Sequence, residues 1–216
     1  LEELMQTAVQ YIDTAMVGAL GTHATAAVGA TTTVNWLIGS SISALGVGFL
    51  SFIARAYGAG DKQAASKAVS QAVIVTVLAG TFFTALTLGL SGLVPVWMQV
   101  DPAIRELAGT YFFILYLPML PRAASAIFST VLRAAGDTKS PLLFLSIAGV
   151  INVILNLIFV IFLHMNVAGV ALATTISQGV SAVLVVIALM RRKDACRLEL
   201  KKMRFHMPQL SKMLRI

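Results

Sequence analysis

Charged side chains are scarce in this sequence. Asp, Glu, Lys and Arg make up 12% of its 216 residues, about half the share found in a typical soluble domain. Hydrophobic residues make up 58%, and the mean hydropathy is +0.87. This composition excludes an ordinary water-soluble domain, and it predicts a protein that lies within a lipid bilayer.

Cysteine and histidine are also rare. Cys196 is the single cysteine, so the sequence cannot form an internal disulfide, and we interpret it as a reduced thiol without a role. The three histidines, His23, His164 and His206, are too far apart in the sequence to predict a metal site. No Gly-rich phosphate loop precedes a basic residue. We therefore predict no catalytic residues, no metal, no cofactor and no enzyme.

Long uncharged stretches are what the sequence has instead. Crossing a hydrocarbon core of ~30 Å takes roughly 20 apolar residues in a helix. Alternation with a period of two is absent, which favours helices over the strands of a barrel. The sequence predicts an all-α membrane protein, a six-helix transmembrane bundle over residues 1–190 with a basic tail at 191–216. The predicted spans are 1–20, 31–54, 69–94, 107–132, 141–163 and 167–190.

The basic residues lie mostly at one end of these spans. Three follow the second span, two follow the fourth and nine lie in the tail, so fourteen of the sixteen share one side. Basic loops stay in the cytoplasm, so this side and the tail are predicted to be cytoplasmic, in the inner membrane if the source is prokaryotic. The net charge of +7 then needs no nucleic acid as a partner, whereas anionic membrane lipid is an expected one.

Arg122 interrupts the fourth span between prolines. Pro118 and Pro121 should kink the helix and free backbone carbonyls. Arg122 is expected to bond those carbonyls or to extend toward the interface, which we favour over a contact with substrate.

Asp13 is the one charged residue in the apolar segment from Leu4 to Leu20, which makes up most of the first predicted span. An intramembrane carboxylate is costly and usually faces the protein interior. Asn152 and Asn156 are four residues apart and so share one helix face, and the sixth span begins with a polar group of Thr174, Thr175, Ser177 and Gln178. Together these oxygens could hold a small cation or a proton. Spacing alone does not separate this possibility from ordinary interhelical hydrogen bonding.

Several motifs in this sequence resemble those of the multidrug and toxic compound extrusion (MATE) transporters. "YIDTAMVGALGTHATAAVG" resembles their first-helix signature, and "SFIARAYGAGDKQAA" resembles the end of their second helix. "LRAAGDTKSP", "NVILNLIF" and "VAGVALATTISQ" follow in the order of their fourth to sixth helices. The resemblance implies a twelve-helix exporter of two six-helix lobes. The present chain would be the amino-terminal lobe, which agrees with its start at Leu1 rather than Met, and a second lobe would be its partner.

The resemblance also implies roles for individual residues. Asp13 matches a cation-coupling acid, and Asn152 and Thr174 match further members of such a site. Asn156 stands where some members carry a second Asp. Because that departure leaves Asp13 as the lone carboxylate, and desolvation favours the neutral form of a lone buried acid, a proton is expected as the coupling ion in preference to sodium.

The substrate implied by the family is a small organic compound, often cationic, exported by alternating access. Candidate residues for lining its cavity are Gln10, Asn35, Arg122 and Gln178. Two alternatives stay open: a lipid-linked oligosaccharide flippase of the same superfamily, which should have several cationic cavity residues, and a non-transporting membrane scaffold, for which Asp13 would be dispensable.

Overall fold

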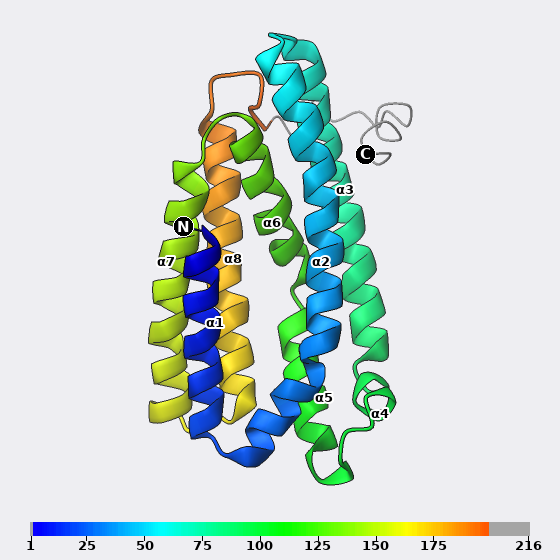
Figure 1. Cartoon of the computed structure of the whole chain (residues 1–216), viewed down its shortest axis with the longest axis vertical. Coiled ribbons are helices and arrows are strands. Elements are labelled where there is room, and N and C mark those ends of the chain that lie inside the picture. Colours follow the sequence, from blue (N-terminus) through cyan, green and yellow to red (C-terminus); the bar gives the residue numbers. More distant parts are fainter. Residues whose placement is uncertain (1, 199–216) are drawn as a thin grey trace.

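The computed structural model describes residues 2–198, and helices make up nearly all of this range (Figure 1). No strand occurs within it, as the predicted fold class requires. The elements are α1 (Glu2–Ala19), α2 (Thr22–Gly58), α3 (Lys62–Leu90), α4 (Val94–Trp97), α5 (Pro102–Tyr116), α6 (Met119–Ala134), α7 (Lys139–Asn156), the π-helix η1 (Leu157–Phe162) and α8 (Val167–Arg191).

Four of the described helices are long and apolar enough to cross a membrane: α2, α3, α7 continued by η1, and α8. The bent pair α5 and α6 makes a fifth if it is counted as one span. The predicted first span, α1, is not among them, because its 18 residues include three acids, Glu2, Glu3 and Asp13, as well as Gln6 and Gln10. It nevertheless lies alongside α7 in the bundle (Figure 1). The protein is therefore an integral, multi-pass membrane protein.

The helices form two groups joined by a central pair. Figure 1 shows α1, α7 and α8 on one side, α2 and α3 on the other, and α5 and α6 between them. The side chains buried most completely come from both groups and from the centre, including Phe49, Ile127 and Leu189. The core therefore runs through α6, and it fixes the position of α8 relative to α2.

The second helix is longer than the sequence pattern predicts. It begins at Thr22 rather than at residue 31, since Gly21, with φ of 104°, ends the turn after α1 and starts the new helix. The residues that follow are rich in alanine and lack proline, so nothing stops the helix there. In Figure 1 its first turns run obliquely under the bundle before α2 becomes upright.

The fourth predicted span is broken near its prolines, as expected. α5 and α6 meet at 51° across Leu117 and Pro118. Proline has no backbone N–H to continue the ladder, and Pro118 here lies just before the first residue of α6. The break turns the start of α6, which carries Arg122, away from the axis of α5.

Close packing of α3 on α6 leads to a stability prediction. A Cβ atom added at Gly80 would lie 2.8 Å from the Cα of Leu120, whereas one added at Gly89 of the same helix would meet nothing within 4 Å. Gly80→Ala should destabilise the protein by about 1–3 kcal/mol because the helices must separate. Gly89→Ala is the matched control and should not destabilise it. Thermal unfolding of the purified variants measures both, and equal unfolding temperatures would contradict the packing argument.

Candidate functional site: a polar ring around Asp13

Four polar side chains from three helices meet in the half of the bundle formed by α1, α7 and α8. Asp13 comes from α1, Asn152 and Asn156 from α7, and Thr174 from α8. Asn152 and Asn156 lie one helical turn apart on the same face of α7. The structure thus brings together the four residues that the sequence analysis selected for coupling.

Their hydrogen bonds form a closed ring. Asn156 Nδ2 donates to Asp13 Oδ1 at 2.6 Å and to Asn152 Oδ1 at 3.1 Å. Asn152 Nδ2 donates to Thr174 Oγ1 at 3.2 Å. Thr174 Oγ1 closes the ring 3.4 Å from Asp13 Oδ2. Asp13 is therefore held from two helices at once, through one oxygen to α7 and through the other to α8.

The ring is largely closed off from its surroundings. Asn156 and Asn152 are buried, while Asp13 and Thr174 are half-buried. Within the described part of the chain, Asn156 Oδ1 is buried and has no hydrogen-bond partner. Since a buried polar atom without a partner is costly, the ring keeps one acceptor that a proton donor or a cation can use.

Thr174 gives the ring a way to accept either charge state of Asp13. A hydroxyl has one hydrogen to donate and two lone pairs to accept with. Thr174 Oγ1 lies 3.0 Å from the carbonyl of Val170 and 3.4 Å from Asp13 Oδ2. It can donate to the ionised carboxylate, or turn its hydrogen to Val170 and accept from the protonated one. The same side chains therefore serve both states.

A metal centre has less support in this arrangement. Asn156 turns its NH₂ group, not its oxygen, toward the carboxylate. A cation held by Asp13 and Asn156 together would need the amide reversed, since only oxygen ligates a hard cation.

A second polar cluster joins α2, α5 and α6. Tyr116 Oη and Arg122 Nη2 both donate to Asn35 Oδ1, at 2.5 Å and 3.1 Å. The Arg122 guanidinium also lies 5.5 Å from the centre of the Tyr116 ring, a cation–π contact. Arg122 was expected to bond the carbonyls freed by the prolines or to extend toward the interface, and its side chain bonds Asn35.

The remaining cavity candidates lie outside both clusters. Gln10 is exposed on α1 and Gln178 is half-buried on α8, and within the described range no hydrogen bond joins either side chain to the ring. Tyr116, which sequence reasoning missed, has an aromatic ring that is typical of a lipid-facing or core position. Its polar role is the hydrogen bond from its hydroxyl to Asn35, which only the structure reveals.

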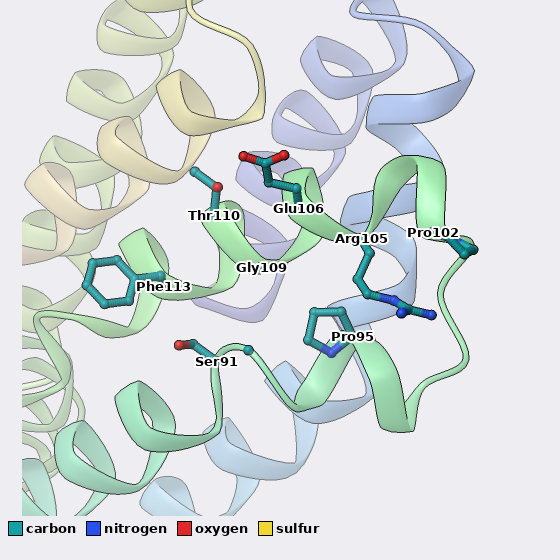
Figure 2. A pocket seen from close by; sticks show the side chains of 9 residues that line it. Ser91, Pro95, Pro102, Arg105, Glu106, Gly109, Thr110 and Phe113 are labelled. Atoms are coloured by element: carbon teal, nitrogen blue, oxygen red, sulfur yellow. The ribbon is translucent and has the colours of Figure 1, made fainter.

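The cavity shown in Figure 2 lies apart from both clusters, where α3 and α4 meet the start of α5. Its volume is about 570 Å³, and its lining includes Ser91, Pro95, Arg105, Gly109 and Phe113. Arg105 is already engaged there, since its Nη2 donates to the carbonyl of Val100 at 3.1 Å. None of the residues predicted to form a functional site lines this cavity.

Comparison with known proteins identifies relatives over nearly the whole chain. The chain is 27% identical over 197 residues to the probable multidrug resistance protein NorM of Thermotoga maritima, covering 89% of this chain and 42% of that protein. It is 30% identical over 182 residues to the probable multidrug resistance protein YpnP of Bacillus subtilis, covering 84% and 41%. It therefore spans less than half the length of these relatives.

A solved structure supports the same assignment. A transporter of the MOP superfamily from Pyrococcus furiosus matches 99% of this chain and 48% of its own, with a TM-score of 0.93 and 27% identity. The family model MatE matches residues 1–158, well over half of the sequence. These matches confirm the resemblance read from the motifs, and with it a family of transporters rather than enzymes. The chain belongs to the MatE family.

Proposed function

We propose that this chain is the amino-terminal lobe of a proton-coupled exporter of small organic compounds. Two of its relatives are named for multidrug resistance, and each is more than twice as long as the aligned segment. A second six-helix lobe would then complete the protein. The organic substrate would bind between the two lobes, where Asn35 and Arg122 supply polar contacts from this one.

The coupling proton is carried by Asp13, and the closed ring of hydrogen bonds is the observation that supports this. Asp13 is the only carboxylate in the ring, so a single proton changes the charge of the whole group. Thr174 provides a partner in both states, as argued above. In the proposed cycle, Asp13 takes up a proton from outside as substrate leaves, and it releases that proton to the cytoplasm.

Protonation also changes how firmly α1 is held. Hydrogen bonds to an ionised acceptor are roughly twice as strong as those between neutral groups. The bond from Asn156 to Asp13 ties α1 to α7, and the contact with Thr174 ties it to α8. Neutralising Asp13 weakens the first and rearranges the second. A shift of α1 that closes the substrate cavity is therefore the conformational step that we assign to the proton.

The alternatives have weaker support. A lipid-linked oligosaccharide flippase should carry several cationic residues in its cavity, and Arg122 is the only basic residue within a predicted span. A passive scaffold gives no reason to hold a carboxylate in a buried polar ring, at a cost of at least ~2.5 kcal/mol for placing it in the membrane.

Export by the intact protein tests the proposal. Expressed in bacteria that lack their own exporters, it should lower the steady-state accumulation of a fluorescent organic cation. Dissipating the transmembrane pH gradient should restore accumulation to the level of cells without the protein. Accumulation that is the same with and without the protein, across a panel of organic cations and neutral drugs, would count against export.

The proposed orientation gives a separate prediction. Cys196, placed in the tail by the sequence analysis, is fully buried and should resist thiol reagents from either side of the membrane. Introduced cysteines are therefore needed, at exposed Lys139 and at exposed Glu106 near the opposite end. An impermeant maleimide added to intact cells should label Glu106→Cys and leave Lys139→Cys unlabelled until the membrane is opened. Labelling of Lys139→Cys but not of Glu106→Cys in intact cells would show that the protein has the opposite orientation.

A further inference from the structure

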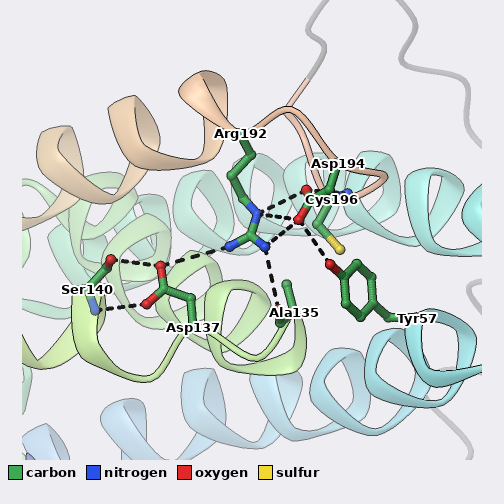
Figure 3. Close-up of polar contacts among 7 residues, drawn as sticks. All are labelled: Tyr57, Ala135, Asp137, Ser140, Arg192, Asp194 and Cys196. Atoms are coloured by element: carbon green, nitrogen blue, oxygen red, sulfur yellow. Dashed lines mark hydrogen bonds and ion pairs between the residues drawn. The ribbon is translucent and has the colours of Figure 1, made fainter.

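The chain folds back on the bundle directly after α8. Arg192 donates from Nε to both carboxylate oxygens of Asp194 at 3.0 Å, and from Nη2 to the carbonyl of Ala135 at 3.4 Å (Figure 3). Its Nη1 lies 3.9 Å from Asp137 in the connection between α6 and α7. Tyr57, at the end of α2, donates to Asp194 at 3.2 Å. The segment after α8 is thus fixed against two other parts of the bundle.

These contacts neutralise the charge of Asp194. Besides Arg192 and Tyr57, the backbone N–H of Cys196 donates to its carboxylate at 3.1 Å. The hydrogen bond from Arg192 is the main reason that the pKa of Asp194 lies below its ordinary value, and burial opposes it. Asp194 is therefore ionised at neutral pH, but its negative charge is matched by the guanidinium beside it.

A cavity of about 450 Å³ opens next to this folded segment. Two of its lining residues, Lys62 at the start of α3 and Lys193 after α8, are basic, and Asp194 is the one acidic residue in the lining. Neither lysine takes part in an ion pair within residues 2–198. The nearby carboxylate of Asp61 accepts from the backbone of Ala64 at 2.9 Å and so caps α3. The lining itself therefore carries two positive charges and one negative charge. The complete lining is Tyr57, Gly60, Lys62, Lys193, Asp194 and Ala195.

The position of this cavity indicates where its ligand lies. α2 ends at Gly58, α3 begins at Lys62 and α8 ends at Arg191, so the cavity is at the level where three apolar helices stop. That level corresponds to the headgroup region of a bilayer. Tyr57, 38% exposed, has the amphipathic ring that is enriched there. The anions concentrated at this level are the phosphates of lipid headgroups.

We propose that Lys62 and Lys193 bind the phosphate of an anionic phospholipid headgroup. The two lysines come from segments far apart in the sequence and line the same cavity, and the contacts of Arg192 with Asp194 and Ala135 fix the segment that carries Lys193. A headgroup bound there would bridge α3 and the segment after α8. The site is distinct from the polar ring around Asp13 and does not depend on the proposed transport cycle.

Lipid binding to the intact protein in neutral detergent tests this site. Phosphatidylglycerol is titrated in and the bound molecules are counted by native mass spectrometry, with phosphatidylcholine as the comparison lipid. The dissociation constant of the tightest phosphatidylglycerol should rise about fivefold for Lys62→Gln or Lys193→Gln and about 30-fold for both. The matched control is Lys67→Gln with Lys139→Gln, which removes the same charge from exposed positions outside the cavity. Its affinity should stay near that of the wild type.

The outcomes separate the possible ligands. An affinity loss in the cavity variant but not in the control, with equal unfolding temperatures and recovery in Lys62→Arg with Lys193→Arg, supports a lipid phosphate. Binding of inorganic phosphate that requires both lysines, while phosphatidylglycerol binding does not, would overturn the lipid ligand and assign the site to a soluble phosphate. Equal losses in the two double variants, or no preference for phosphatidylglycerol over phosphatidylcholine, would overturn the proposal.

Discussion

Asp13→Asn should abolish gradient-driven efflux by the intact protein. Asparagine has the shape of the ionised side chain but cannot take up or release a proton, so the neutral state becomes permanent. The substrate should accumulate in cells that express the variant to the level seen without the protein. Efflux of a fluorescent organic cation from preloaded cells, energised by a pH gradient, measures this directly.

The same substitution should leave the fold intact. An amide at position 13 can still accept from Asn156 through its oxygen, and its NH₂ group can donate to Thr174. We therefore expect an unfolding temperature close to that of the wild type and measurable substrate binding. Thr14→Ala is the control on the same helix, because among residues 2–198 the Thr14 hydroxyl bonds only the carbonyl of Gln10, within α1. Wild-type efflux and pH dependence in Asp13→Asn would remove Asp13 from the mechanism.

Asn156→Asp should turn the ring into a sodium site. The atom of residue 156 that now donates to Asp13 Oδ1 lies 2.6 Å from it, so the substitution would place two carboxylate oxygens at about the same separation. Two carboxylates this close cannot both ionise without a bound cation. Sodium should therefore stabilise the variant, by about 2.7 kcal/mol at a concentration 100 times the dissociation constant. Thermal unfolding in sodium compared with choline chloride measures the effect.

Asn35→Asp is the matched control for the added charge. It places a carboxylate beside Arg122, which already supplies a cation, so sodium should change its stability no more than that of the wild type. A variant Asn156→Asp that shows no sodium-dependent stabilisation would contradict the sodium site, and would mean either that the two carboxylates share a proton or that they do not face each other.

The sequence predicts the ring better than it predicts the helix ends. Asn152 and Asn156 share a face of an α-helix, and an acid in an apolar segment needs polar partners, so spacing and solvation made the grouping possible but did not decide it. The motif resemblance supplied Thr174. Which atoms bond each other, including the choice of Thr174 between Val170 and Asp13, depends on the relative positions of three helices and appears only in the structure.

Other features carry a sequence signal with more than one meaning. The predicted spans left residues 22–30 outside any helix, yet they form the start of α2 because alanine favours the helix and nothing interrupts it. The basic residues after α8 were interpreted only as a signal of topology. Their positions in the sequence do not predict that Arg192 bonds Asp194 and Ala135. Residues 199–216 of the predicted tail lie outside the described range.

The most direct test of the central claim is to identify which ion crosses the membrane in the direction opposite to the substrate. The intact protein is reconstituted into proteoliposomes with either a pH gradient at equal sodium or a sodium gradient at equal pH, and substrate and proton fluxes are recorded together. If Asp13 carries the coupling proton, the pH gradient alone should drive substrate export with an opposing proton flux, and both fluxes should vanish in Asp13→Asn. Export that follows the sodium gradient and ignores pH, or a proton flux that persists in Asp13→Asn, would contradict the account.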